Sequence, residues 1–116
     1  MSKLRATLEL AVPRDQAAAA CRRAVVELGW SVLEDRQDTL VAREDAARLH
    51  CHCPPATAAV RVHSQGASST VVEMETKVPG FGPISAGHAE EQSKVLARRI
   101  GLLVAGDDGQ PSAVRF

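Results

Sequence analysis

Residues 70–78 read Thr-Val-Val-Glu-Met-Glu-Thr-Lys-Val, and their alternation of side chains decides the fold class. Successive side chains of a strand face opposite sides. Val72, Met74, Thr76 and Val78 therefore share one face, and the charged residues 73, 75 and 77 share the other. A strand with one apolar and one charged face is typical of an antiparallel sheet that is covered on one side only.

The rest of the chain supplies the other strands and two helices. Alternation predicts a strand over residues 3–12, ended by Pro13, and apolar residues at helical spacing predict a helix from a cap at Asp15 to Gly29. A hairpin turning at Gln37-Asp38, a short strand from Arg48 to Cys53 and a strand over 57–64 precede the stretch quoted above. A longer helix is expected over about 85–105.

These elements predict a two-layer α+β fold. We expect an antiparallel sheet of five or six strands, in the chain order strand, helix, five strands, helix, with the long C-terminal helix packed on one face. Residues 1–106 are expected to form a single domain. Residues 107–116 have the composition of a flexible C-terminal tail.

Composition excludes several function classes. The chain has 14 basic and 14 acidic residues, so no strong field attracts nucleic acid, and it has no apolar run of membrane-spanning length. With no export signal at its start, we expect a cytoplasmic protein. Three cysteines, an odd number, fit reduced thiols better than a disulfide framework.

Two segments and the order of the elements carry a resemblance to a known superfamily. The segments are Leu10-Ala11-Val12-Pro13-Arg14-Asp15-Gln16-Ala17 and Lys77-Val78-Pro79-Gly80-Phe81-Gly82-Pro83-Ile84. In this pattern the chain resembles a small START-like, or Bet v 1-like (SRPBCC), domain, with TATA-binding-protein-like topology in the broad sense. The resemblance implies a curved sheet that grips the C-terminal helix, with an apolar cavity between them for a hydrophobic small molecule.

The leading hypothesis is a non-enzymatic START-like module that binds a small hydrophobic ligand. The residues expected to line its pocket lie on the first strand, the strongest strand and the last helix: Leu8, Val72, Met74, Leu96 and Ile100. We expect no cofactor and no catalytic residue, because the chain has no nucleophile elbow, no phosphate-binding glycine loop and no carboxylate pair in apolar surroundings.

Two alternatives remain open. The first is a protein–protein interaction or structural module without a small ligand, acting as a homodimer through an edge strand or the charged sheet face. The weaker one is metal binding through His50, Cys51, His52 and Cys53, because imidazoles and thiolates suit zinc. Period two puts only two of these four on each face of a strand, so our prediction is that no metal binds there. Cys21 is expected to lie in the core.

Overall fold

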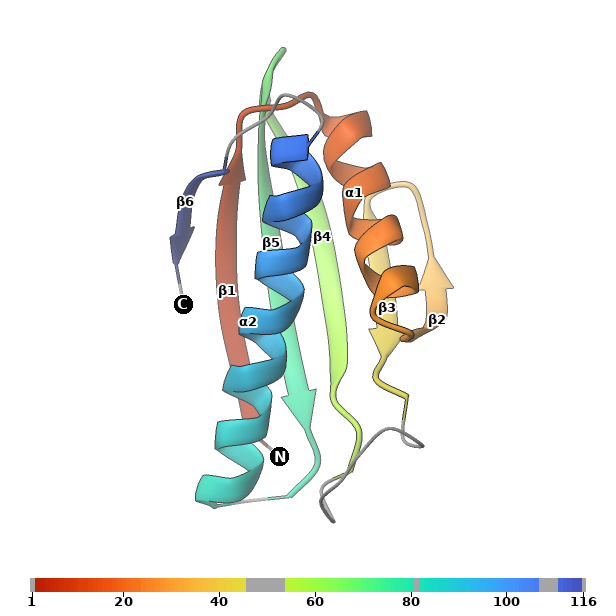
Figure 1. Cartoon of the computed structure of the whole chain (residues 1–116), viewed down its shortest axis with the longest axis vertical. Helices are drawn as coiled ribbons and strands as arrows, with labels where there is room; N and C mark the ends of the chain where they lie inside the picture. Colours follow the sequence, from red (N-terminus) through yellow and green to blue (C-terminus); the bar gives the residue numbers. More distant parts are fainter. Residues whose placement is uncertain (1, 46–53, 81, 107–110, 116) are drawn as a thin grey trace.

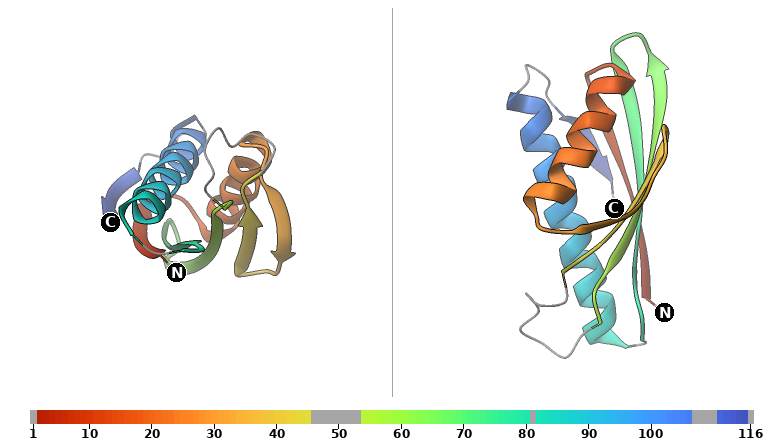
Figure 2. Two further views of the ribbon diagram at one scale, coloured as in Figure 1. Left: turned by 90° about the horizontal axis from the view of Figure 1, so that it is seen from below. Right: turned by 90° about the vertical axis from the view of Figure 1, so that its right-hand side faces the viewer.

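The computed structural model describes residues 2–45, 54–80, 82–106 and 111–115 (Figure 1). The elements in chain order are β1 (Ser2–Leu10), α1 (Arg14–Glu27), β2 (Ser31–Asp35), β3 (Thr39–Arg43), β4 (Thr57–Gly66), β5 (Ser69–Val78), α2 (Pro83–Gly106) and β6 (Pro111–Arg115). The strands form one antiparallel sheet in the order β2-β3-β4-β5-β1-β6. Both helices cover the same face of it (Figure 2), which confirms the predicted two-layer α+β fold.

Three details differ from the sequence expectation or fall outside it. The strand expected from Arg48 to Cys53 lies outside the described residues. Within the segment 107–116, which composition placed in a tail, residues 111–115 form β6 and pair with β1. This pairing satisfies backbone groups along the outer edge of β1, a gain that side-chain composition does not reveal. Helix α1 begins at Arg14 with Pro13 as its N-cap, so Asp15 lies inside the first turn and is not the cap.

Helix α1 ends at Glu27, and Gly29 closes it with a left-handed turn, as the sequence predicts. The Gly29 N–H donates to the Val26 carbonyl, and the Trp30 N–H donates to the Val25 carbonyl. This bond pattern needs a left-handed residue after the helix, and Gly29 has φ of 77°. The cap turns the chain directly into β2 and leaves the Trp30 side chain buried in the core.

Small side chains dominate the layer between the helices and the sheet. On the sheet, Ala6, Ala42 and Ala58 face the helices, and the buried alanines of α1 are Ala17, Ala20 and Ala24. Because these side chains end at Cβ, the helix axes lie close to the sheet and the larger residues fill the space between. Nearly all buried apolar residues form one continuous cluster, the main core. In the part of the chain that the structure describes, no helix is long and apolar enough to span a membrane.

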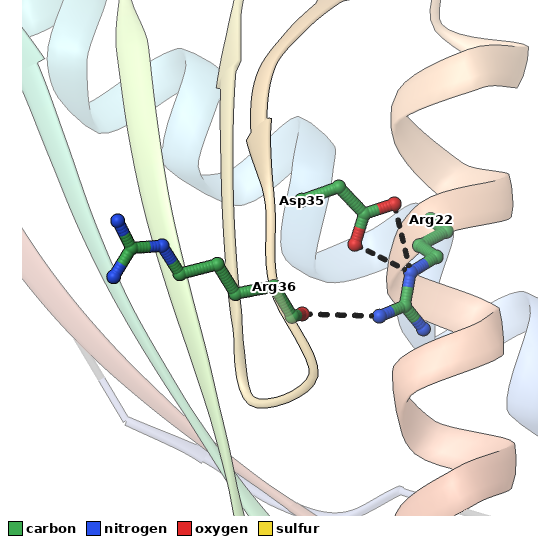
Figure 3. A network of polar contacts seen from close by, with 3 residues as sticks. All are labelled: Arg22, Asp35 and Arg36. Atoms are coloured by element: carbon green, nitrogen blue, oxygen red, sulfur yellow. Dashed lines mark hydrogen bonds and ion pairs between the residues drawn. The ribbon is translucent and has the colours of Figure 1, made fainter.

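Two arginines fasten the β2–β3 hairpin to α1. The Arg22 Nε donates to both carboxylate oxygens of Asp35, at 2.9 and 3.1 Å, and its terminal nitrogen donates to the Arg36 carbonyl (Figure 3). At the start of α1, Arg14 bonds the Asp38 carboxylate at 2.6 Å. Both pairs are exposed to solvent, so they fix the position of the hairpin more than they stabilise the fold.

The junction between β1 and α1 is held by one buried hydrogen bond. The Thr70 hydroxyl, on β5 and fully buried, donates to the Val12 carbonyl at 2.8 Å. A carbonyl in this position has no strand partner, because β1 has ended at Leu10 and α1 has not begun. The bond therefore satisfies a backbone acceptor that the fold buries.

Replacing Thr70 with valine tests this bond. Thr70→Val keeps the side-chain shape but leaves the Val12 carbonyl unpaired, so we expect a loss of about 1 to 2 kcal/mol in unfolding free energy by denaturant titration. Ser64→Ala is the control, since it removes a hydroxyl–carbonyl bond to Gly66 that is exposed. It should change stability by less than about 0.5 kcal/mol. Equal stability of Thr70→Val and the natural protein would contradict this account.

Candidate functional site

The five residues expected to line a ligand pocket lie together at the interface between α2 and the sheet. Helix α2 packs on β1 and β5, which carry Leu8, Val72 and Met74, and its own Leu96 and Ile100 belong to the same main core. All five side chains are between 0 and 2 % exposed. A void wide enough for water would leave accessible area on its walls, so these side chains pack against neighbours. The apolar cavity that the resemblance implies is therefore not open among these five residues in this structure, because their side chains fill the interface.

Two buried hydroxyls interrupt this apolar interface. Thr76 on β5 and Ser93 on α2 are both 0 % exposed, and neither hydroxyl has a hydrogen-bond partner among the described residues. Along β5, Thr76 lies between Met74 of the main core and Val78. Along α2, Ser93 lies between Leu96 of the main core and Ala89. We call Thr76 and Ser93 the polar layer.

The polar layer separates the main core from a second, smaller cluster. This small core consists of Ala56, Val78 and Ala89, at the end of the molecule where α2 begins. Among the described residues, Val78 is the one large aliphatic side chain in it, so this part buries little apolar area. An unpaired buried hydroxyl costs about 1 to 3 kcal/mol. The interface is therefore least stable between its two apolar parts.

A histidine–glutamate pair ties the same end of α2 to the sheet. His88 Nε2 lies 2.7 Å from Glu44 Oε1, and the two side chains are only 10 % and 12 % exposed. The same carboxylate oxygen accepts the Ala56 N–H at 3.2 Å, and the Glu44 N–H donates to the Ala56 carbonyl. Glu44 directly follows β3, so the pair links α2 to β3 and β4 beside the small core.

The opposite face of the sheet carries a wide, open hollow of about 500 Å³. The side chains that line it come from β1, β4 and β5, and they include both positive and negative groups: Arg5, Thr7, Ala59, Arg61, Glu73, Glu75 and Lys77. Glu75 accepts hydrogen bonds from Lys77 and Arg5, which hold the pKa of its carboxyl below the usual value. The hollow forms where the short side chains of Thr7 and Ala59 stand among long charged ones.

Several other sequence expectations have clear outcomes. His63 faces the open side of the sheet, as predicted, with its Nε2 at 3.6 Å from Glu73 Oε2. Cys21 is buried in the main core, also as predicted. His50, Cys51, His52 and Cys53 lie outside the described residues. Among the residues that are described, no group of three or more histidine, cysteine or acidic side chains is placed to hold a metal ion.

No protein-family model and no curated protein matches the chain. Among solved structures it superposes on the di-domain aromatase/cyclase StfQ of the steffimycin biosynthetic pathway, with a TM-score of 0.55 and 12 % identity over 84 % of this chain and 43 % of StfQ. It also superposes on TTHA0849 from Thermus thermophilus, with a TM-score of 0.51 and 10 % identity over 90 % of this chain and 98 % of that one.

The chain has the fold of these proteins. It spans less than half the length of StfQ and nearly all of TTHA0849. At such low identities the likeness shows the fold alone. That fold is consistent with the START-like, or Bet v 1-like, resemblance of the sequence.

Sequence reasoning missed three features of the site. It treated Thr76 as an ordinary inward residue of its strand and did not single out Ser93. It also did not connect Glu44 with His88, because 44 residues separate them and no local pattern links them. The sequence contains a hint of the hollow, because Thr7 and Ala59 are short residues at outward-facing positions. Recognising that they lie near each other requires the strand register.

Burial makes the Cys21 thiol unreactive. Desolvation raises its pKa to about 12, against a small opposing effect of the Arg22 charge, so the thiol is neutral at physiological pH. In a C51S/C53S variant, where Cys21 is the only cysteine, we expect no reaction with Ellman's reagent under native conditions and complete reaction in denaturant. Rapid labelling of the native variant would show that the core around Cys21 is open.

Proposed function

We propose that this protein is a non-enzymatic START-like module that binds a small hydrophobic ligand between α2 and the sheet. The observation that carries the proposal is the polar layer, two fully buried hydroxyls without partners among the described residues, at the place where the apolar interface is interrupted. Buried polar groups in native proteins are nearly always satisfied, and exceptions often mark a functional position. Polar groups of a bound ligand, such as a carbonyl or a hydroxyl, would provide the partners that Thr76 and Ser93 lack among the described residues.

The remainder of such a ligand would contact the apolar residues on either side of the polar layer. Met74 and Leu96 of the main core are the nearest of the expected binding residues along the chain, with Val72, Leu8 and Ile100 further from the small core. The methionine side chain is flexible and adapts its shape to a ligand. The same fold occurs in StfQ, an aromatase/cyclase of a biosynthetic pathway, which supports a small-molecule role.

Binding requires the first half of α2 to move away from the sheet, because the interface is closed. That half is held by the small core and by the His88–Glu44 pair, whereas the second half is held by the main core and by the Arg99–Glu27 ion pair to α1. We infer that the N-terminal half opens. Only molecules with this half open bind the ligand. The apparent affinity is therefore the affinity of the open form multiplied by the fraction of molecules that are open.

The homodimer alternative receives less support from the described surface. Three exposed apolar side chains, Val26, Val32 and Leu33, gather near the start of β2, which is an edge strand. However, β2 has only five residues and its register shifts between Val32 and Glu34. Short and bulged edges resist pairing with another chain. We therefore place ligand binding first.

Substitutions of the two hydroxyl residues of the polar layer test the proposal. The probe is 2-naphthol, a small aromatic molecule with one hydroxyl, and the reporter is the ¹³C-labelled methyl group of Met74. We expect the probe to shift this resonance in the natural protein and in Thr70→Val, but not in Thr76→Val or Ser93→Ala. Because Thr76→Val removes an unpaired hydroxyl, it should leave stability unchanged or raise it by about 1 kcal/mol, in contrast to Thr70→Val.

Two outcomes would contradict the proposal. One is an unchanged Met74 resonance in the natural protein at saturating probe. The other is equal binding by Thr76→Val and Ser93→Ala, which would place any ligand away from the polar layer. Native mass spectrometry of protein purified from its own host complements the test, because a retained mass identifies the natural ligand class.

A further inference from the structure

The uncovered face of the sheet has an uneven charge distribution. Strand register places Lys3, Lys77, Thr57 and Arg43 in one row across β1, β5, β4 and β3. The next row contains Arg5, Glu75 and Ala59, and the third contains Thr7, Glu73 and Arg61. The second and third rows and Lys77 of the first line the hollow of about 500 Å³, whereas Lys3, Thr57 and Arg43 are not among its lining residues.

Five cations and two carboxylates occupy these rows, a net charge of +3 on a chain whose total charge is zero. We call the five cations the basic patch: Lys3, Arg5, Arg43, Arg61 and Lys77. The helical side of the molecule differs, because four of its arginines pair with carboxylates: Arg14, Arg22, Arg23 and Arg99. The hollow itself is lined by three of the five cations, Arg5, Arg61 and Lys77, and by both carboxylates, so its lining has a net charge of +1.

Three members of the basic patch have no partner among the residues that the structure describes. Lys3, Arg43 and Arg61 make neither a hydrogen bond nor an ion pair there, although Arg61 lies directly across from Glu73 in the register. Lys3 and Lys77 are also direct cross-strand neighbours. Like charges in that position destabilise a sheet.

Glu75 organises the middle of the patch. Its two carboxylate oxygens take Arg5 Nε at 3.0 Å and Lys77 Nζ at 3.2 Å, so two cations from different strands converge on one anion. This trio keeps a net positive charge. Arg61 and Ala59 also line the hollow, from β4, where Ala59 lies opposite Glu75 and Arg61 lies opposite Glu73.

We propose that the hollow on the uncovered sheet face binds a small molecule through a compact anionic group, phosphate or carboxylate, with Arg61 and Lys77 as its main contacts. Guanidinium and ammonium groups form their strongest hydrogen bonds with these anions. The volume lies within the range of small-molecule sites. A long polyanion fits less well, because Glu73 lies in the third row and Glu9 in the row after it on the same face, and both repel an extended negative chain.

This site is independent of the proposed ligand site between α2 and the sheet, since it lies on the opposite face. Occupancy of one therefore does not require the other. The test below uses anions that carry no hydrophobic part, so its result does not depend on whether a ligand binds beneath α2.

Titration with pyrophosphate and, separately, citrate tests the proposal by calorimetry and by ¹H–¹⁵N NMR. We expect binding at low ionic strength that weakens at about 0.15 M salt, with shifts centred on residues 59, 61, 73 and 75. Arg61→Gln should weaken binding about tenfold, as expected for the loss of one charged hydrogen bond. Glu75→Gln should tighten it, since the substitution removes a competing anion from Arg5 and Lys77.

Arg98→Gln is the matched control. Arg98 is an exposed arginine of α2, likewise without a partner among described residues, and its replacement changes the total charge equally. Arg98→Gln should bind both anions as the natural protein does. Tighter binding of pyrophosphate than of citrate indicates a phosphate site, and the reverse order indicates a carboxylate site. Equal weakening by Arg61→Gln and Arg98→Gln, weaker binding by Glu75→Gln, or no binding of either anion at low salt would overturn the proposal.

Discussion

The close approach of two helices to one face of the sheet is the constraint on which the rest of the structure depends. Alanines on both sides of the interface bring α1 and α2 near the strands, and larger side chains such as Leu8 and Ile100 then fill the remaining space. With only 116 residues, the chain uses most of its apolar side chains in this single layer. The opposite face remains open to solvent and polar.

This constraint also explains why the interface is not uniform. Apolar contacts are continuous where α1 and α2 both cover the sheet. Beyond the end of α1, α2 is the one described element on this face, and there the small core and the His88–Glu44 pair hold it. Thr76 and Ser93 lie at the boundary. A helix held firmly at one end and weakly at the other opens first at the weak end, since local opening follows the buried apolar contacts.

Fold class followed from sequence because it depends on periodicity. The alternation of residues 70–78 and the glycine cap at Gly29 are local signals, and both match the structure. Strand β6 was missed because its five residues carry no strong pattern and pair only because the edge of β1 is available. Composition reflects side-chain preference, whereas this pairing satisfies the backbone.

The candidate sites were harder to predict for the same reason. The proposed binding position in the core is marked by hydroxyls without partners among the described residues, a property of their neighbours that only three-dimensional packing defines. The basic patch likewise depends on register, because its members are far apart in sequence and meet only across four strands.

Native-state hydrogen exchange is the measurement that tests the central claim most directly, namely that the polar layer divides the interface into a firm part and a part that opens. The account predicts that amides of α2 from residues 87 to 93 exchange through an opening that costs less free energy than global unfolding, while the amides of β5 from Val72 to Met74 exchange only on global unfolding. Exchange of both segments with the same free energy and the same denaturant dependence would contradict it, because the interface would then open as a single unit.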